Sequence, residues 1–222
     1  MKYLALLTLL AALSVTAQPV PSDDSSQAGL VGWWTFNEGA GTMAKDYSGN
    51  GYNATLSTSS WGVGVIGSAF NCVLGAKITT PSISIGTTFT ISLWIKPTSQ
   101  SSSYGSLVSD SAGNNGLFFK STQKLSFYSG GNHENITAIP FGTWTHVVAT
   151  VNSGALTFYL NGSPDGTNSG IGAWTASRMG DDSGDTLNNS LVDDPRIYNR
   201  ALSAAEVAGL YWEVASQWKQ GP

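Results

Sequence analysis

Pairs of carboxylates are the first residues whose spacing could support catalysis in this chain. Retaining glycosidases hold a nucleophile and a general acid about 5 Å apart, and two glutamates on one strand can supply such a pair. The chain has four glutamates, which are Glu38, Glu134, Glu206 and Glu213. No two of them share a strand-like spacing with an aspartate between them, since the first two lie in Gly/Asn-rich turns and the last two in a predicted helix. The carboxylate pair of a glycosidase is therefore missing.

The sequence also offers few residues that could act as a catalytic nucleophile or as its general base. His133 and His146 are the two histidines, and no G-x-S-x-G elbow is present. His133 lies in a turn that we expect to be exposed, and we expect His146 to be part of the scaffold of a strand. Cys72 is the single cysteine, so no internal disulfide can form, and its strand-like surroundings favour a small buried hydrophobic role. The sequence predicts that the chain is not an enzyme.

Oxygen-bearing side chains gather in residues 46–51 (DYSGNG). Asp46, Ser48 and Asn50 occupy positions 1, 3 and 5, with glycine at position 6, as in the first half of an EF-hand loop. The twelfth position is Ser57, where an EF-hand requires glutamate, and no helices flank the run, so an EF-hand is excluded. What remains is an oxygen-rich turn suited to a hard cation.

One further carboxylate lies in the strand predicted for residues 191–198. Strict alternation places Asp193 on the same strand face as Leu191 and Ile197, which makes it a candidate inward-facing group. A buried carboxylate must be paired or must bind a metal.

Aromatic side chains are the candidates for ligand binding, because sugars are held by ring faces together with Asn and Asp hydrogen bonds. Trp34 and Phe36 share one face of the opening strand and are expected in the core, whereas Trp33 faces the other way and could be exposed. The other candidates lie in loops or flank turns. The predicted ligand-binding residues are Trp33, Trp61, Tyr104, Tyr128 and Trp174. For each of them, ordinary packing is the alternative role.

Apolar and polar residues alternate at every second position over much of the chain, which predicts β-strands. The pattern is clearest in residues 89–95, 146–151 and 156–160. Shorter strand candidates are residues 105–109, 116–120, 124–128 and 191–198. Gly, Asn, Asp and Pro separate these runs at close spacing, and no repeat of 20 to 50 residues is apparent.

One helix is predicted, and it lies near the C-terminus. Ser203 and Glu206 form a capping box, and good helix formers follow from Ala204 to about Trp218. An apolar stripe consists of Val207, Leu210, Tyr211 and Val214. This stripe can dock on a sheet.

The N-terminus has the features of a secretory signal peptide. Lys2 precedes an apolar run over residues 4–15, and Val15-Thr16-Ala17 places small residues where a signal peptidase cleaves. The run is too short to span a bilayer of about 30 Å. We therefore expect residues 1–17 to be removed, residues 18–27 to form a flexible leader, and residues 28–222 to form one domain of an exported protein with no membrane span.

The charge balance argues against a nucleic-acid partner. The chain carries ten basic and fourteen acidic residues, with a formal net charge of −4. Phosphate binding depends on clustered lysines and arginines, which this chain lacks.

Motifs at both ends of the chain resemble a known family. Residues 29–39 (GLVGWWTFNEG) and residues 191–203 (LVDDPRIYNRALS) resemble the two ends of a laminin-G-like domain, within the concanavalin A-like lectin/glucanase jelly rolls. Internal segments over residues 46–51, 89–97, 142–149 and 160–162 match as well. The resemblance covers roughly residues 28–211. It implies an all-β fold, a two-sheet antiparallel jelly-roll sandwich, to which the pattern above adds one short C-terminal helix.

The resemblance also implies a structural calcium ion where the first and last strands meet. Its ligands would be Asp46, Asn50 and Asp193, together with backbone carbonyls. In the alternative interpretation, Asp46 and Asn50 are turn residues that bond their own backbone. Asp193 would then pair with Arg196 or Arg200.

For function, we predict a secreted, non-catalytic module that binds a polysaccharide or glycoconjugate. The alternative is an extracellular adhesion or structural protein that binds a protein partner. A glycoside hydrolase is a third reading, which the missing carboxylate pair disfavours.

Overall fold

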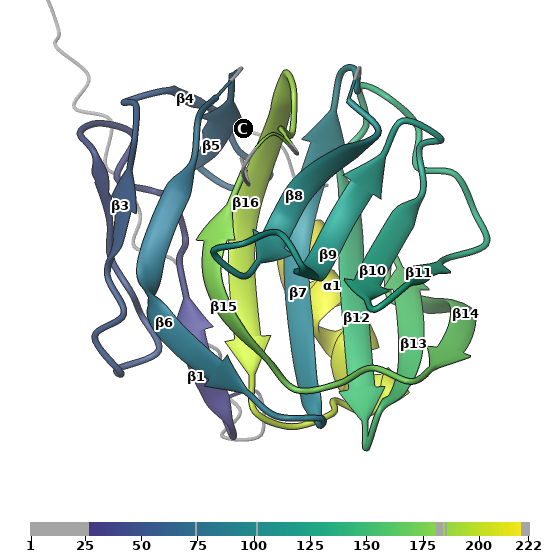
Figure 1. The fold of residues 1–222 in the computed structure, drawn as a ribbon. Helices are drawn as coiled ribbons and strands as arrows, with labels where there is room; N and C mark the ends of the chain where they lie inside the picture. The colour runs from purple at the N-terminus through teal and green to yellow at the C-terminus, as the bar shows by residue number, and fades with distance from the viewer. Residues whose placement is uncertain (1–26, 74, 101, 181–183, 185, 219–222) are drawn as a thin grey trace, which may run out of the picture.

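Two antiparallel sheets of eight strands each pack face to face in the computed structural model (Figure 1). The structure describes residues 27–73, 75–100, 102–180, 184 and 186–218. The predicted signal peptide and all but the last residue of the predicted leader lie outside the described residues. The two-sheet all-β sandwich predicted from the sequence is confirmed.

One sheet, called here the helix-covered sheet, contains the strands with the clearest alternation. Its order is β14 (Ser163–Ser169), β13 (Ala155–Leu160), β12 (Thr145–Asn152), β7 (Phe89–Pro97), β16 (Ser190–Tyr198), β5 (Ser68–Cys72) and β4 (Trp61–Val63), with β1 (Leu30–Trp33) paired to β16. The predicted strands over residues 89–95, 146–151, 156–160 and 191–198 are all present. The pairing of β1 with β16 also places the first and last predicted strands side by side, as the sequence predicts.

The other sheet, called here the open sheet, has no helix over its outer face in the described part of the chain (Figure 1). Its order is β11 (Asn132–Glu134), β10 (Leu125–Ser129), β9 (Asn115–Lys120), β8 (Tyr104–Ser109), β15 (Trp174–Met179), β6 (Ile78–Ile85), β3 (Ala54–Leu56) and β2 (Met43–Ala44). Three of the predicted short strands correspond to β8, β9 and β10. The sequence analysis missed β6 and β15, and it placed Trp174 in a loop although this residue begins β15.

The main core fills the space between the sheets. Trp34 and Phe36 are fully buried in it, as expected from the face that they share, and Cys72 is buried there as a small apolar side chain. Burial raises the pKa of the Cys72 thiol, so the sulfur stays protonated and unreactive.

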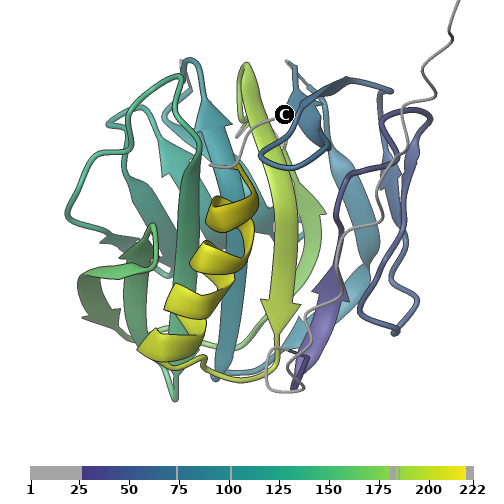
Figure 2. The same ribbon diagram turned by 180° about the vertical axis from the view of Figure 1, so that it is seen from behind.

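The helix α1 (Ala204–Trp218) lies on the outer face of the helix-covered sheet (Figure 2). The predicted capping box is formed, since the Ser203 backbone N–H donates to Glu206 Oε2 at 2.7 Å and the Glu206 N–H donates to Ser203 Oγ at 3.3 Å. Val207, Leu210 and Val214 are buried against the sheet. None of the helices in the described residues is long and apolar enough to cross a membrane.

A bulge interrupts β16 and changes which way its side chains point. The register against β7 shifts between Asp193 and Arg196, and Asp194 adopts a positive φ of 51°. Ile197 therefore faces the main core, whereas Asp193 pairs with Trp94, which packs in the cluster under α1. The expectation that Asp193 and Ile197 share a face was wrong, because strict alternation holds only in a strand without a bulge.

Candidate functional site

The three candidate tryptophans do not form a common surface. Trp33 is 5% exposed, and its Nε1–H donates to Asp194 Oδ1 at 2.5 Å. Trp174 is 6% exposed and packs edge-on against Phe89 and Phe127 in the main core. Trp61 is half-buried in β4, and its Nε1–H donates to the carbonyl oxygen of Gly41 at 3.2 Å. The expected exposure of Trp33 and the loop position of Trp174 are thus both corrected.

The two candidate tyrosines lie on the same face of the open sheet. Leu117, Phe119, Leu125 and Phe127 point into the main core, so the residues that alternate with them point outward. Across the strands, Tyr104 pairs with Lys120, Phe118 pairs with Ser106 and Ser126, and Tyr128 pairs with Asn132. We call this surface the Tyr104 face, and it consists of Tyr104, Phe118, Lys120, Ser126, Tyr128, Asn132 and Glu134.

Tyr104 is the centre of a hydrogen-bond network on this face. Asn132 Nδ2 donates to the Tyr104 hydroxyl oxygen at 2.8 Å, and Ser126 Oγ donates to Asn132 Oδ1 at 3.0 Å. The ring packs edge-on against Phe118, with 5.9 Å between the ring centroids. Phe118 and Ser126 are almost fully buried, whereas Tyr104 is half-buried and Asn132 is exposed. The ring is therefore held in place from below and at its hydroxyl group.

A charged pair lies beside the ring. Lys120 forms an ion pair with Glu134, and its Nζ lies 5.0 Å from the Tyr104 ring centroid. The hydrogen bond with Glu134 raises the pKa of Lys120 above its usual value, so the amine is charged at neutral pH. The face therefore combines a half-exposed ring with a cation, a carboxylate and an amide, all on neighbouring strands.

Lys120, Asn132 and Glu134 were missed as ligand candidates by the sequence analysis. It placed Glu134 and His133 in a turn, but both lie in β11, and His133 is half-buried. The only available signal was the alternation in residues 124–128 followed by Gly130-Gly131, which marks a hairpin and hence a return strand.

The predicted calcium ligands Asp46 and Asn50 are engaged in hydrogen bonds within their loop and with the backbone of β1. Asp46 Oδ1 accepts from the N–H groups of Trp33 and Ser48, and Oδ2 accepts from Ser48 Oγ and from the Tyr52 N–H, all within 2.8–3.0 Å. Asn50 Nδ2 donates to the carbonyl oxygen of Leu30 at 3.2 Å. These donors point toward the oxygens that a cation would need, so this arrangement does not fit a calcium ligand set. Asp46 bonds the backbone of its own turn, as in the alternative, whereas Asn50 bonds the backbone of β1.

Asp193 is 1% exposed and accepts hydrogen bonds from the backbone of another loop. The Val65 N–H donates to Asp193 Oδ2 at 2.9 Å, and the Ile66 N–H donates to the same atom at 3.4 Å. The predicted alternative, an ion pair with Arg196 or Arg200, is not formed. Arg196 instead pairs with Asp194 at 2.9 Å and with Glu213 at 3.2 Å, and Arg200 pairs with Glu206 at 2.7 Å. Among the residues that the structure describes, no group of three His, Cys, Asp or Glu side chains could hold a metal ion.

Known proteins resemble this chain in sequence and in fold. Residues 74–208 match the family described as the concanavalin A-like lectin/glucanases superfamily. The chain belongs to the concanavalin A-like lectin/glucanases superfamily. The resemblance predicted from the terminal motifs is confirmed. A comparison with curated proteins finds no match.

Several solved structures share this superfamily fold. Domain 4 of AbnA, a GH43 extracellular arabinanase from Geobacillus stearothermophilus solved in complex with arabinotriose, is similar with a TM-score of 0.68 and 24% identity, over 83% of this chain and 98% of that chain. The binding domain of Paraclostridial Mosquitocidal Protein 1 is similar with a TM-score of 0.66 and 21% identity, over 84% of this chain and 52% of that chain. Trypanosoma rangeli sialidase matches with a TM-score of 0.62 and 17% identity, and the alignment covers 82% of this chain and 32% of the sialidase. At these identities the likeness shows the fold.

The superfamily includes both lectins and glucanases, so the positions of the acidic residues matter. Glu206 and Glu213 lie on α1, Glu134 lies in β11, and Glu38 follows β1, where it accepts from the Lys45 N–H at 2.9 Å. His146 is buried beside Ser92, whose Oγ lies 2.9 Å from His146 Nε2. Burial, together with the nearby charge of Arg196, lowers the pKa of His146 to about 3. A neutral, enclosed imidazole of this kind fits the scaffold role predicted from the sequence.

Proposed function

We propose that this superfamily member is a non-catalytic carbohydrate-binding module, and that the Tyr104 face holds its ligand. The observation that carries the proposal is the Tyr104 face itself, on which β8, β9 and β11 bring together a half-exposed ring, an amide and a charged pair. Sugars are bound by this combination, because ring faces contact C–H groups while fixed polar groups bond the hydroxyls.

Contacts within the protein hold the ring of Tyr104 in place. Tyr104 is held through its hydroxyl oxygen by Asn132 and through its ring edge by Phe118. Side chains fixed on strands lose little conformational entropy when a ligand binds, which leaves more of the contact energy for affinity. A sheet face that no helix in the described residues covers also accommodates the interior of a polymer chain.

The proposed absence of catalysis is supported by the placement of the glutamates after β1, in β11 and on α1, and by the buried, neutral His146. Purified protein is expected to release no reducing sugar above the blank from arabinan, xylan or β-glucan, because the four glutamates do not form the acid and nucleophile pair of a retaining glycosidase. Activity that survives purification and disappears with one Asp or Glu substitution would contradict this part of the proposal.

Export is also part of the proposal, and it rests on the N-terminal pattern, with Lys2 before an apolar run. AbnA, from which one similar domain comes, is described as extracellular. Mass spectrometry of protein from the culture medium should give a mature chain that begins at Gln18. An intact Met1 in exported protein would contradict signal-peptide cleavage.

Affinity electrophoresis in gels that contain arabinan, galactan, xylan or β-glucan tests the ligand class. Arabinan comes first, because domain 4 of AbnA was solved with arabinotriose. We expect at least one polymer to retard the wild-type protein. The Tyr104→Ala variant is expected to lose that retardation, with binding weakened at least about tenfold.

Tyr47→Ala is the matched control for this experiment. Tyr47 is 45% exposed and has Lys45 Nζ 4.9 Å from its ring centroid, which closely resembles the arrangement of Lys120 over Tyr104. Tyr47 lies in the loop after β2, so its loss should leave retardation unchanged. Equal retardation of wild type and Tyr104→Ala would rule out the Tyr104 face, and no retardation by any neutral polymer would favour the alternative, an extracellular protein partner.

A further inference from the structure

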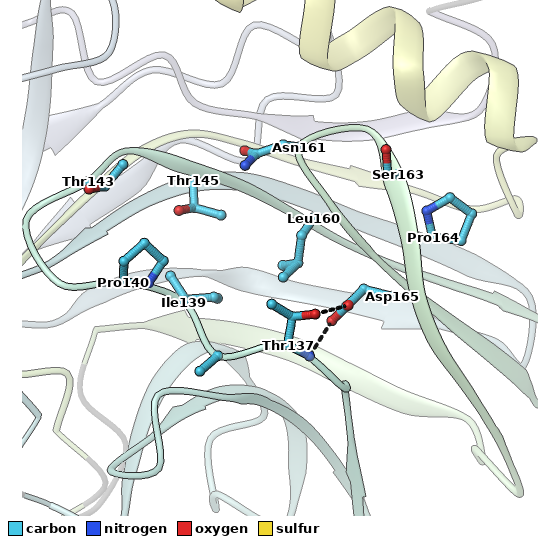
Figure 3. A pocket seen from close by; sticks show the side chains of 11 residues that line it. Thr137, Ile139, Pro140, Thr143, Thr145, Leu160, Asn161, Ser163, Pro164 and Asp165 are labelled. Carbon is cyan, nitrogen blue, oxygen red and sulfur yellow. Dashed lines mark hydrogen bonds between the residues drawn. The ribbon is translucent and has the colours of Figure 1, made fainter.

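A pocket lies at the edge of the sandwich where β11 leads into β12, and none of its lining residues belongs to the Tyr104 face. It has a volume of about 290 Å³ and opens between residues 137–143 and the β13–β14 hairpin (Figure 3). Pockets for small organic ligands measure roughly 300–1,000 Å³, so this one suits a single small ring and not an oligomer.

The pocket presents no free charge. Asp165 is the one charged residue among those that line it. Its Oδ1 accepts from Thr137 Oγ1 at 2.6 Å, and its Oδ2 accepts from the Thr137 N–H at 3.0 Å (Figure 3). Asn135 Nδ2 also donates to Oδ2, at 2.6 Å. These hydrogen bonds occupy the carboxylate and hold residues 135–137 against β14. A cation would have to break these bonds, and an anion would meet no lysine or arginine in the lining.

Asn161 is held in one orientation at the pocket wall. Its backbone N–H donates to the His146 carbonyl oxygen at 2.9 Å, and its Oδ1 accepts from the His146 N–H at 3.0 Å. Its φ of 50° suits asparagine in the left-handed region of a tight hairpin turn. With Oδ1 engaged, the amide nitrogen is the group left to donate to a ligand. Thr143 and Thr145 also line the pocket and carry hydroxyl groups (Figure 3).

Apart from Ser163, the remaining lining is aliphatic. Ala138, Pro140, Leu160 and Pro164 supply C–H surface without an aromatic ring. Next to the lining residues along the same loop, Ile136 is 70% exposed and Phe141 is 41% exposed, which adds apolar surface beside the pocket. Uncharged hydroxyl and amide groups that alternate with aliphatic surface match a ring that carries both hydroxyl groups and C–H faces.

We infer that this pocket binds one uncharged, hydroxyl-bearing ring, either a single neutral sugar unit or a cyclic polyol. The inference shares its ligand class with the proposed function but concerns a different place on the molecule. Because a pocket encloses one ring, it would recognise a chain end or a side branch. The open Tyr104 face would accept the interior of a chain.

Backbone-amide NMR titrations with galactose, arabinose and myo-inositol test the inference. We expect saturable shift changes confined to residues 137–145 and 160–165. Galacturonate should bind about tenfold more weakly or not at all, since its carboxylate would be desolvated without a cationic partner.

Two variants and one matched control locate the binding. Asn161→Asp keeps the acceptor for the His146 N–H and the tolerance of a positive φ, but it removes the amide donor. Thr143→Trp changes an exposed lining residue and fills the cavity without disturbing the core. Each is expected to weaken the response at least about tenfold. Thr167→Trp, an exposed position on β14 outside the lining, should bind like wild type.

The outcomes separate this inference from the proposed function. Shift changes that fall only on the Tyr104 face, that persist unchanged in Thr143→Trp, or that fail to appear with any of the three neutral probes would overturn the pocket assignment. None of these results would contradict the proposed function, which is tested by whether polysaccharide retardation depends on Tyr104. Conversely, pocket shifts that remain in a protein no polymer retards would support the pocket and contradict the proposed function of the Tyr104 face.

Discussion

The guanidinium group of Arg196 lies over the indole ring of Trp33, with 4.6 Å between Arg196 Cζ and the ring centroid. The same Asp194 carboxylate accepts from Trp33 Nε1 and pairs with Arg196, and Glu213 reaches Arg196 from α1. Burial by itself lowers the pKa of the Arg196 guanidinium group. The negative charges of Asp194 and Glu213 have the larger effect, so the pKa is raised. This cluster joins the first strand, the last strand and the helix.

Removing Arg196 should therefore be costly. The Arg196→Ala variant leaves Asp194 buried without its cation, so we expect the free energy of unfolding to fall by about 3–5 kcal/mol. Urea denaturation followed by tryptophan fluorescence measures this. Arg200→Ala is the control, because its pair with Glu206 is 29% exposed on both sides and should contribute less than about 1 kcal/mol. Similar losses for the two variants would contradict the special role of the buried cluster.

Asp193 should make stability depend on pH. Burial raises the pKa of its carboxyl, the charge of Asp194 raises it further, and the N–H groups of Ile66 and Val65 oppose the shift. The folded chain thus holds this proton to higher pH than the unfolded chain. The resulting contribution to stability is complete below the usual pKa of 3.8 and is lost as the pH rises through the folded value.

The Asp193→Asn variant separates the charge from the hydrogen bonds. Its amide oxygen can still accept from the Val65 N–H, but it carries no charge to bury. We expect the variant to be more stable than wild type at pH 7, and the difference to shrink toward pH 3.8. Urea midpoints at the two pH values provide the comparison. A variant that is less stable at pH 7 would mean that the ionised carboxylate is favoured where it lies.

Asp46 allows a direct test of the calcium prediction. Its oxygens already accept four donors, so the melting temperature should be the same in excess calcium and in chelator. A bound calcium at a hundredfold excess over Kd would add about 2.7 kcal/mol. For a chain of this size that corresponds to a shift on the order of 5–10 °C. Such a shift, lost in Asp46→Ala, would show that the loop rearranges around the ion.

Local patterns predicted most of the framework. Period-2 alternation identified β7, β12 and β13, which pair through the β7–β12 and β12–β13 ladders without a register shift, and the capping box at Ser203 identified the start of α1. Alternation could not identify β14, since Pro164 and Gly166 make this edge strand look like a turn. It also gave the wrong face for Ile197 relative to Asp193, because a bulge depends on tertiary contacts that one strand does not reveal.

The candidate site was only partly predictable for a similar reason. Tyr104 and Tyr128 were identified as single aromatic residues, and register across β8, β9 and β10 brings them to one face. Trp33 was expected to be exposed because its burial depends on Arg196, which is far from it in the sequence but adjacent in the sheet. Side-chain exposure is decided by such distant partners, so residue type and local spacing alone do not determine it.

The position of α1 has a practical consequence for measuring binding. The helix packs on the outer face of the helix-covered sheet, and the Tyr104 face lies on the opposite side of the sandwich (Figures 1 and 2). A sensor surface that captures the protein through a tag placed after α1 would therefore be attached on the side of the helix-covered sheet. The Tyr104 face, where we propose that sugar binds, would then point into the flowing solution. Coupling through lysine amines, which would modify Lys120, would not be needed.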